Sequence, residues 1–178
     1  MTGKRKTLLL DGTPCIIRPI SPADRNAFVD GFEELSEESR FRRFFFNKKT
    51  LTESELVKLA NPDGYEHIAY GVAALEDGET ETPIAVGHCF RQKDEPDLAE
   101  VALVTSDLWQ GFGAGSELVK SLAAASLEKG IRRWFAVMLP DNDAMLRLLQ
   151  KYGTNLRENL TGGVVEVFCD IDEKAVYK

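Results

Sequence analysis

The sequence predicts an α/β (α+β) chain with a mixed, mostly antiparallel sheet of about seven strands flanked by helices. Three observations support this prediction. Apolar runs with strand-like alternation recur along the 178 residues, and amphipathic segments of helical period separate several of them. Short polar turns at EDGETE and TGG join neighbouring strands as antiparallel hairpins. No linker, repeat or low-complexity stretch divides the chain, so we expect a single domain over 1–178.

The first half contains a strand, several helices and then a group of strands. Residues 13–20 form the first predicted strand, and the following SPAD supplies an N-cap serine, an N1 proline and an acidic first turn. These signals predict a helix that runs to about residue 35. Thr52 and Glu55 form a capping box for a short helix ending near residue 61. Three strands follow it, at 67–75, 83–93 and 97–105.

The segment RFRRFFFNKK at 40–49 interleaves arginines with phenylalanines. A nucleic-acid interface would use such rings for stacking and the cations for phosphates. A net charge of −7 and a pI near 5.0 oppose a phosphate backbone at long range, so we expect no nucleic-acid partner. The predicted alternative is a short helix, capped by Ser36, with three buried rings and three solvated cations. These are Phe41, Phe44 and Phe45, and Arg40, Arg42 and Arg43.

The second half alternates helix and strand. A glycine-rich loop at 110–115 opens a helix that runs to about residue 128. Residues 132–139 form a nearly continuous apolar strand, of the kind that is buried on both faces. Another helix covers about 142–153. The last two strands form a hairpin within 156–171 that turns at TGG.

Composition and cysteine usage indicate the cellular compartment of the chain. The apolar run at 8–10 stops at Asp11, so we expect no secretion signal, and no window is apolar enough for a membrane helix. Three widely spaced cysteines in strand-like runs, Cys15, Cys89 and Cys169, are typical of reduced thiols and match neither a disulfide frame nor a zinc site. We therefore expect a cytoplasmic monomer or homodimer with no membrane partner and no metal.

The loop QGFGAG at 110–115 carries three glycines between a strand and a helix. Glycine lets backbone approach a ligand, and a helix start presents free N–H groups and partial positive charge, so an anion is the natural guest. A P-loop needs a lysine and a Ser/Thr directly after its last glycine, whereas Ser116 and Glu117 follow here. Two alternatives stay open: a dinucleotide site with Asp141 as ribose-binding acid, and a connector without a ligand.

The motif Gln110-Gly111-Phe112-Gly113-Ala114-Gly115, the order of elements and NDAMLRLLQKYG at 142–153 together resemble the GNAT superfamily of acyl-CoA-dependent N-acetyltransferases. The resemblance covers essentially the whole chain. The segments RPISPADRNAF, LSEESRFRRFF and AEVALVTSDLWQGFGAG are most similar to the catalytic domains of bacterial protein lysine acetyltransferases. The resemblance implies a sheet that splays at the strands before and after the loop.

The resemblance also implies acetyl-CoA as cosubstrate. Loop N–H groups would hold its diphosphate, the preceding strand would hydrogen-bond its pantetheine arm, and Asn142 would lie beside it beyond the next strand. Asn142 could equally be a helix cap. The implied cofactor-binding residues are Leu103, Val104, Thr105, Gln110, Gly111, Phe112, Gly113, Ala114, Gly115, Ser116 and Asn142.

Acetyl transfer to an amine needs a base near neutrality, because an acceptor lysine has a pKa of about 10.4. Glu100 is the candidate catalytic base. It lies in an apolar strand without an obvious charged partner, and a glutamate at this place is the base in the lysine acetyltransferases that the sequence resembles. The alternative is a strand residue that faces solvent.

A general acid is harder to assign. Many members of the superfamily use a tyrosine where this sequence has Leu149, so Tyr152, close to one helical turn further on, is a candidate catalytic acid or a packing residue. Alternation along the strand places His88 and Cys89 on opposite faces, so we expect a structural histidine and no Cys-His dyad. Trp109 is expected to anchor the loop by packing.

The leading hypothesis is an N-acetyltransferase that moves an acetyl group from acetyl-CoA to a primary amine, with a protein lysine as acceptor. A small-molecule amine, such as a polyamine or an aminoglycoside, would need the same chemistry in another pocket. The hypothesis from a different class is a non-catalytic acyl-CoA-binding sensor that keeps the fold and lacks the acid.

Overall fold

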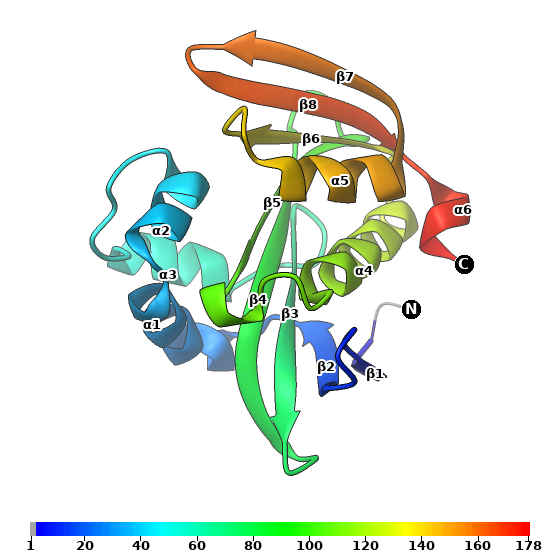
Figure 1. Ribbon diagram of the computed structural model, residues 1–178. Coiled ribbons are helices and arrows are strands. Elements are labelled where there is room, and N and C mark those ends of the chain that lie inside the picture. The colour runs from blue at the N-terminus through cyan, green and yellow to red at the C-terminus, as the bar shows by residue number, and fades with distance from the viewer. Residues whose placement is uncertain (1–2) are drawn as a thin grey trace.

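The computed structural model describes residues 3–178 (Figure 1). Its strands are β1 (Arg5–Leu8), β2 (Pro14–Pro19), β3 (His67–Glu76), β4 (Thr80–Arg91), β5 (Leu98–Thr105), β6 (Arg133–Met138), β7 (Gly153–Thr161) and β8 (Val164–Ile171). Its helices are α1 (Arg25–Glu34), α2 (Glu37–Phe44), α3 (Glu53–Ala60), α4 (Ala114–Glu128), α5 (Asp143–Tyr152) and α6 (Glu173–Val176). Two 3-10 turns, η1 (Pro22–Asp24) and η2 (Asp107–Trp109), precede α1 and the glycine loop.

The strands form one eight-stranded sheet in the order β1-β2-β3-β4-β5-β6-β8-β7. Every pairing is antiparallel except that of β5 with β6. The prediction of a mixed, mostly antiparallel α/β sheet is confirmed, with eight strands in place of about seven. The additional strand is β1, which pairs with β2 at the edge of the sheet.

The sheet splays between β5 and β6. Only the pairs Leu98↔Arg133, Ala99↔Trp134 and Glu100↔Phe135 join these two parallel strands. Beyond them β5 continues to Thr105 while it pairs with β4 alone, and β6 continues to Met138 while it pairs with β8. The two strands therefore part after Glu100, as the resemblance implies.

Helices cover both faces of the sheet (Figure 1). On one face α4 packs against β3 and β4, with α5 and α6 beside it. Gly87 of β4 makes this packing close, because a Cβ there would lie 2.7 Å from Leu122 of α4. The fully buried Trp134, Leu118 and Val101 belong to the core on this side. The other face carries α1, α2 and α3, so the central strands of the sheet lie between two helical layers.

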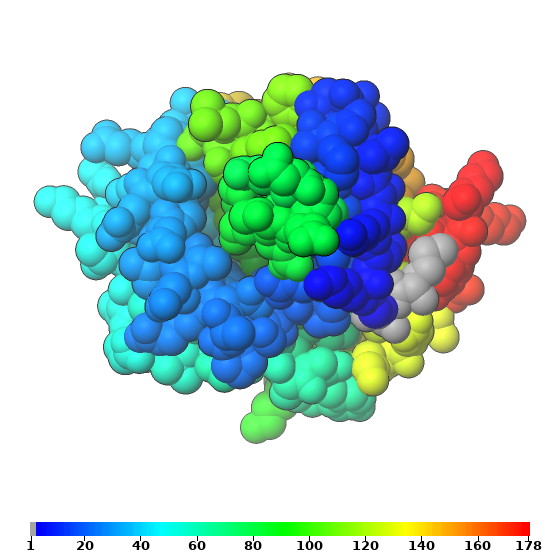
Figure 2. Space-filling model, turned by 90° about the horizontal axis from the view of Figure 1, so that it is seen from below, coloured from blue at the N-terminus to red at the C-terminus, as the bar shows by residue number. Residues whose placement is uncertain are grey.

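The tip of the β3–β4 hairpin projects at one end of the molecule (Figure 1). Figure 2 views this end, where the tip of the β3–β4 hairpin lies between α1 and the N-terminal strands. The hairpin turns through Asp77 and Gly78, both with positive φ, within the predicted EDGETE connection. The caps of the helices also follow the sequence, since Ser36 accepts from the N–H of Ser39, and Thr52 and Glu55 form a capping box.

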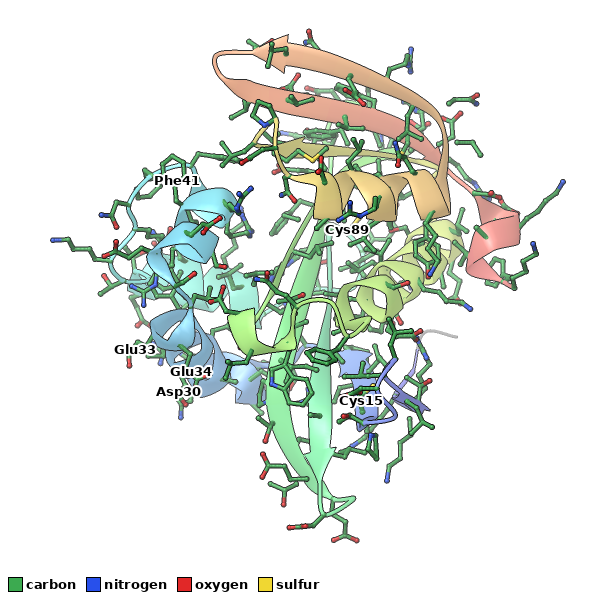
Figure 3. The ribbon with its side chains drawn as sticks, in the orientation of Figure 1. Cys15, Asp30, Glu33, Glu34, Phe41 and Cys89 are labelled. Carbon is green, nitrogen blue, oxygen red and sulfur yellow. The ribbon has the colours of Figure 1, made fainter. Side chains whose placement is uncertain are left out.

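The prediction for the phenylalanine and arginine helix was partly wrong. Phe41 is exposed at the outer surface of α2 (Figure 3), whereas Phe44 and Phe45 are half-buried. Arg43 turns inward toward the sheet instead of remaining solvated, and it lies within electrostatic reach of Glu100.

None of the helices within residues 3–178 is long and apolar enough to cross a membrane.

Candidate active site

The glycine loop ends in a helix start that no side chain caps. Gly111 and Gly113 have φ values of 84° and 93°, a region that glycine enters without strain. Gly113 is the N-cap of α4, and no side chain there accepts a hydrogen bond from the first turn. The first bond back into the loop comes from the N–H of Glu117 to the carbonyl of Gly113 at 3.1 Å. The earlier N–H groups of α4 are thus available to an anion.

Contacts to α2 and to the N-terminal segment hold the loop in place. The Asp107 carboxylate accepts hydrogen bonds from the N–H of Ser36, at 2.8 Å, and from the hydroxyl of Ser39. Burial raises the pKa of Asp107, but the bonds from these two serines outweigh burial and lower it overall. On the other side, the carbonyl of Phe112 accepts from the N–H of Leu10 at 3.0 Å. Sequence reasoning missed Asp107, which fixes the loop relative to α2.

Two other predicted loop residues have structural contacts. The side chain of Gln110 donates to the carbonyl of Thr105 at 3.4 Å and to Asp107 at 3.3 Å, so it braces the loop against the end of β5. The ring of Phe112 meets Trp109 edge to face, with centroids 6.2 Å apart. Trp109 packs against the main core, as predicted.

The end of β5 presents a free edge toward the splay. Leu103, Val104 and Thr105 pair with β4 on one side, and none of them pairs with β6 on the other. Gly115, in the first turn of α4, lies close by: a Cβ there would be 3.9 Å from the Thr105 hydroxyl and 4.0 Å from Leu103. The structure therefore brings the predicted strand residues and the helix start to one side of the gap.

Ser116 lies at the centre of a small polar cluster. Its hydroxyl is 2.8 Å from the Tyr152 hydroxyl and accepts a hydrogen bond of 2.7 Å from the Lys151 amine. Tyr152 is 4% exposed, and its ring belongs to the core beneath α4. Asn142 caps α5, because its side-chain oxygen accepts from the N–H of Met145 at 3.1 Å. Tyr152 therefore packs in the core and Asn142 caps a helix, which are the structural alternatives that the sequence left open for these two residues.

Glu100 faces the opposite side of the sheet from Tyr152. It pairs across strands with Phe90 of β4 and with Phe135 of β6, so the three side chains share the face that α2 covers. The ring of Phe135 stacks on Phe168 of β8, with centroids 5.4 Å apart. The half-buried Glu100 therefore lies between two aromatic walls, at the last pair before the strands part.

Arg43 lies within electrostatic reach of Glu100, although no hydrogen bond or ion pair joins the two side chains. Burial lowers the pKa of the Arg43 guanidinium, and the negative charge of Glu100 acts in the opposite direction. The two groups therefore attract each other across the space between α2 and β5. Sequence reasoning missed this because it placed the Arg43 side chain in solvent.

His88 forms a pair with His67, which the sequence analysis did not single out. Their facing nitrogens, Nδ1 of His88 and Nε2 of His67, are 2.9 Å apart, and both side chains are buried. Burial lowers the pKa of His67 to about 4, and burial also lowers that of His88 well below its ordinary value. Cys89 points the other way, with its sulfur 3.4 Å from the Ser126 hydroxyl of α4, so the predicted separation of His88 and Cys89 is confirmed.

Comparisons with known proteins place this geometry in a family. The family model described as an acetyltransferase (GNAT) domain matches residues 15–155, which include the loop, Glu100 and Tyr152. The chain belongs to the GNAT acetyltransferase family. Within residues 3–178, no group of three or more His, Cys, Asp or Glu side chains could hold a metal ion.

Two curated acetyltransferases are similar to this GNAT chain. Acetyltransferase Pat of Mycolicibacterium smegmatis is 31% identical over 156 residues, which cover 87% of this chain and 45% of Pat. Acetyltransferase PA5475 of Pseudomonas aeruginosa is 27% identical over 135 residues, which cover 76% of this chain and 72% of that protein. The chain thus spans slightly less than half the length of Pat.

Solved structures share the fold. The GNAT domain of PAT from S. lividans has a TM-score of 0.81 and 29% identity, and the match covers 94% of this chain and 97% of that domain. A cAMP-binding acyltransferase from Mycobacterium smegmatis has a TM-score of 0.64 and 24% identity over 95% of this chain and 47% of the other. At that identity the second likeness concerns the GNAT fold alone.

Proposed function

We propose that this chain transfers an acetyl group from acetyl-CoA to a primary amine, that the acceptor is a protein lysine, and that residues 1–178 act as a single acetyltransferase domain in the cytoplasm. The uncapped start of α4 beside the free edge of β5 is the observation that carries the proposal. The sequence resemblance to bacterial protein lysine acetyltransferases and the match to Pat support the choice of acceptor. Three buried free cysteines support a reducing compartment.

The residues around the gap fit coenzyme A without a metal. The N–H groups of Ala114, Gly115 and Ser116 suit a diphosphate, because a helix start offers both hydrogen-bond donors and partial positive charge. Backbone groups from Leu103 to Thr105 suit the amides of a pantetheine arm, because that edge of β5 has no strand partner. When bound, acetyl-CoA would supply the acyl group as a thioester.

The positions named for cofactor contact differ in the part we assign to them. Backbone at Gly111, Phe112 and Gly113 lets the loop approach the diphosphate, whereas the Gln110 side chain holds the loop in shape. Asn142 caps α5 and lines a small hollow of about 30 Å³ beyond the end of β6, and we assign it to the cofactor's side of that strand.

Glu100 is the proposed general base. A carboxylate at the point where β5 and β6 part can accept a proton from the acceptor ammonium, which leaves the amine neutral. Phe90 and Phe135 limit water on either side of Glu100, and Arg43 keeps a positive charge nearby. Tyr152 remains a prediction as proton donor to the departing thiolate, and its burial beside Ser116 supports the packing alternative.

Release of free thiol from acetyl-CoA tests the proposal, with lysine-containing peptides, spermidine and an aminoglycoside as acceptors. Glu100→Gln is expected to lower kcat by about 100-fold or more, because it removes the base, and to leave coenzyme A affinity almost unchanged. Glu79→Gln is the matched control: it makes the same charge change at an exposed turn residue far along the hairpin.

The two readouts separate the alternatives. Turnover with lysine peptides that falls in Glu100→Gln and persists in Glu79→Gln supports the full proposal. Tight coenzyme A binding without transfer to any acceptor would show a binding module in place of an enzyme. Equal rates in the two variants would remove Glu100 from the mechanism.

A further inference from the structure

A cavity of about 120 Å³ lies between α1, α2 and the sheet, on the face that also carries Glu100. Most of its lining is apolar and aromatic, including Phe28 and Phe32 of α1, Phe44 of α2 and Val86 of β4. One water needs about 10–15 Å³ measured in this way, so the space is several times larger than a single-water site and can hold a small molecule. An apolar cavity of this size suits the hydrocarbon part of a small ligand.

Four charged side chains line this cavity: Arg18, Asp24, Glu34 and Arg43. The first three either form ion pairs or are exposed to solvent. Arg18 is paired with Asp24, at 2.7 Å, and with Glu81, at 2.9 Å. Glu34 is exposed at the end of α1. The fourth is Arg43, the cation that α2 directs toward the sheet.

The Arg43 guanidinium is short of hydrogen-bond acceptors. Across residues 3–178 no ion pair or hydrogen bond joins it to another side chain, and its contact is with the ring of Phe44, whose centroid lies 5.1 Å from Cζ. Glu100 attracts it from beyond hydrogen-bonding distance. A guanidinium carries five N–H donors in a planar fork that matches a carboxylate, and leaving such a group half-buried without acceptors is costly.

We propose that this cavity binds a carboxylate on a short apolar chain, with Arg43 gripping the carboxylate and the phenylalanines of α1 and α2 enclosing the chain. A monovalent carboxylate matches the charge of Arg43, the cation of the lining that has no ion pair among residues 3–178. A phosphate dianion would leave a net negative charge in an apolar space beside Glu34 and Glu100, which opposes its burial.

The position of the cavity links this ligand to the proposed transfer reaction. Val104 and Ser106 at the end of β5 line it, and Val104 shares a sheet face with Glu100, separated along that face by the small Ala102. The carboxylate could therefore belong to either partner of the reaction: an acyl group that ends in a carboxylate, or an acceptor that carries one beside its amine. Resting on the proposed function, this inference adds the substrate class that the site selects.

Binding of hexanoate to the intact chain tests the site without any cofactor, so its failure is distinct from failure of the transfer reaction. By calorimetry we expect hexanoate to bind at least about tenfold more tightly than hexanamide, which has the same shape without the charge. Arg43→Met should abolish this difference. Arg42→Met is the matched control, because Arg42 lies on the same helix but pairs with Asp141 and Glu38 outside the cavity.

The comparison of hexanoate with hexanamide on the unaltered chain decides the question even if Arg43→Met fails to fold. Equal affinity for the two molecules, or no binding of either, would overturn the proposal. Retention of hexanoate affinity in a folded Arg43→Met variant would overturn the part assigned to Arg43.

Two kinetic arms then identify the source of the carboxylate. The donor arm compares succinyl-CoA with butyryl-CoA, and the acceptor arm compares lysine with cadaverine, which is lysine without its carboxyl group. In one arm, Arg43→Met should remove a preference for the carboxylated molecule that Arg42→Met keeps. Preferences unchanged in both arms would overturn the link between the cavity and the reaction.

Discussion

The His67–His88 pair predicts how the stability of this protein depends on pH. The chain contains two histidines, so these residues are its complete set of imidazoles. Their facing nitrogens are 2.9 Å apart, and Phe90 stacks on both rings. A neutral pair can share one hydrogen, with one ring donating and the other accepting, whereas two protonated rings would both be donors. The perturbation is therefore a fall in pH from 7.5 to 5.5.

The magnitude follows from the pKa of His67. Its ordinary value of 6.5 falls to about 4 in the folded protein because of burial. The unfolded chain therefore binds more protons than the folded chain as the pH drops through 6.5, so stability is lost toward acid. Between pH 7.5 and 5.5 this difference costs about 1.3 kcal/mol for His67 alone, with His88 adding a loss of the same sign. For a chain of this size the His67 loss corresponds to a fall in Tm of roughly 3–5 °C.

Urea unfolding at pH 7.5 and 5.5 measures the loss, and the double variant His67→Gln/His88→Gln supplies the control. The variant has no imidazole to titrate in this window, and ordinary carboxyl groups titrate near pH 4, so its unfolding free energy should change little between the two pH values. The informative quantity is the change with pH within each protein.

Nuclear magnetic resonance of the imidazole protons gives an independent measurement on the unaltered chain. Neither histidine should titrate between pH 7.5 and 5.5 while the protein stays folded. An imidazole with a midpoint near 6.5 would refute the reasoning, as would equal losses of unfolding free energy in the parent and the double variant.

Two further predictions concern the start of α4. Gly113→Ala should lower stability by about 1 kcal/mol in urea unfolding and weaken coenzyme A binding, because φ at this position is 93° and the added Cβ would lie 3.0 Å from Leu10. The control is Gly31→Ala, in α1 with open space around it, which is expected to be neutral or stabilising. Equal losses of stability in the two variants would contradict the strain argument. Tyr152→Phe and Ser116→Ala should each cost about 1 kcal/mol and together less than the sum, because each removes the same 2.8 Å hydrogen bond; additive losses in the double variant would show that the two hydroxyls act independently.

Local patterns in the sequence were sufficient for most of the framework. Caps such as Ser36 depend on a few neighbouring residues, and both the cap and its helix appear where the sequence predicts them. Alternation along β4 is also a local property, because the backbone of a strand fixes its side-chain period, and it places His88 and Cys89 on opposite faces. The glycine loop also belongs to this class, since positive φ at Gly111 and Gly113 is a local property.

The features that were missed depend on how distant segments meet. The strand β1 is four residues long, too short for a period to be recognised, and it exists because β2 pairs with it. His67 acquires a role only through the register of β3 against β4, which sets it opposite Phe90 and diagonal to His88. In the C-terminal part of α2, from Arg40 to Phe44, every position is an arginine or a phenylalanine, so that stretch offers no contrast to show which side faces inward. Arginine also has a long apolar stem that tolerates either side.

The division of the site between two faces of the sheet has a consequence for the proposed reaction. The proposed cofactor-binding groups belong to α4 and to the edge of β5, whereas the Glu100 side chain lies on the face that α2 covers. The two faces are connected through the opening where β5 and β6 part, and Glu100 and Phe135 form the last pair before that opening. In the proposed reaction, the acceptor amine would therefore approach from the α2 side while the donor lies against α4. Residues on α2 that point toward β5, with Arg43 foremost, are then the ones in a position to select the acceptor or the acyl group.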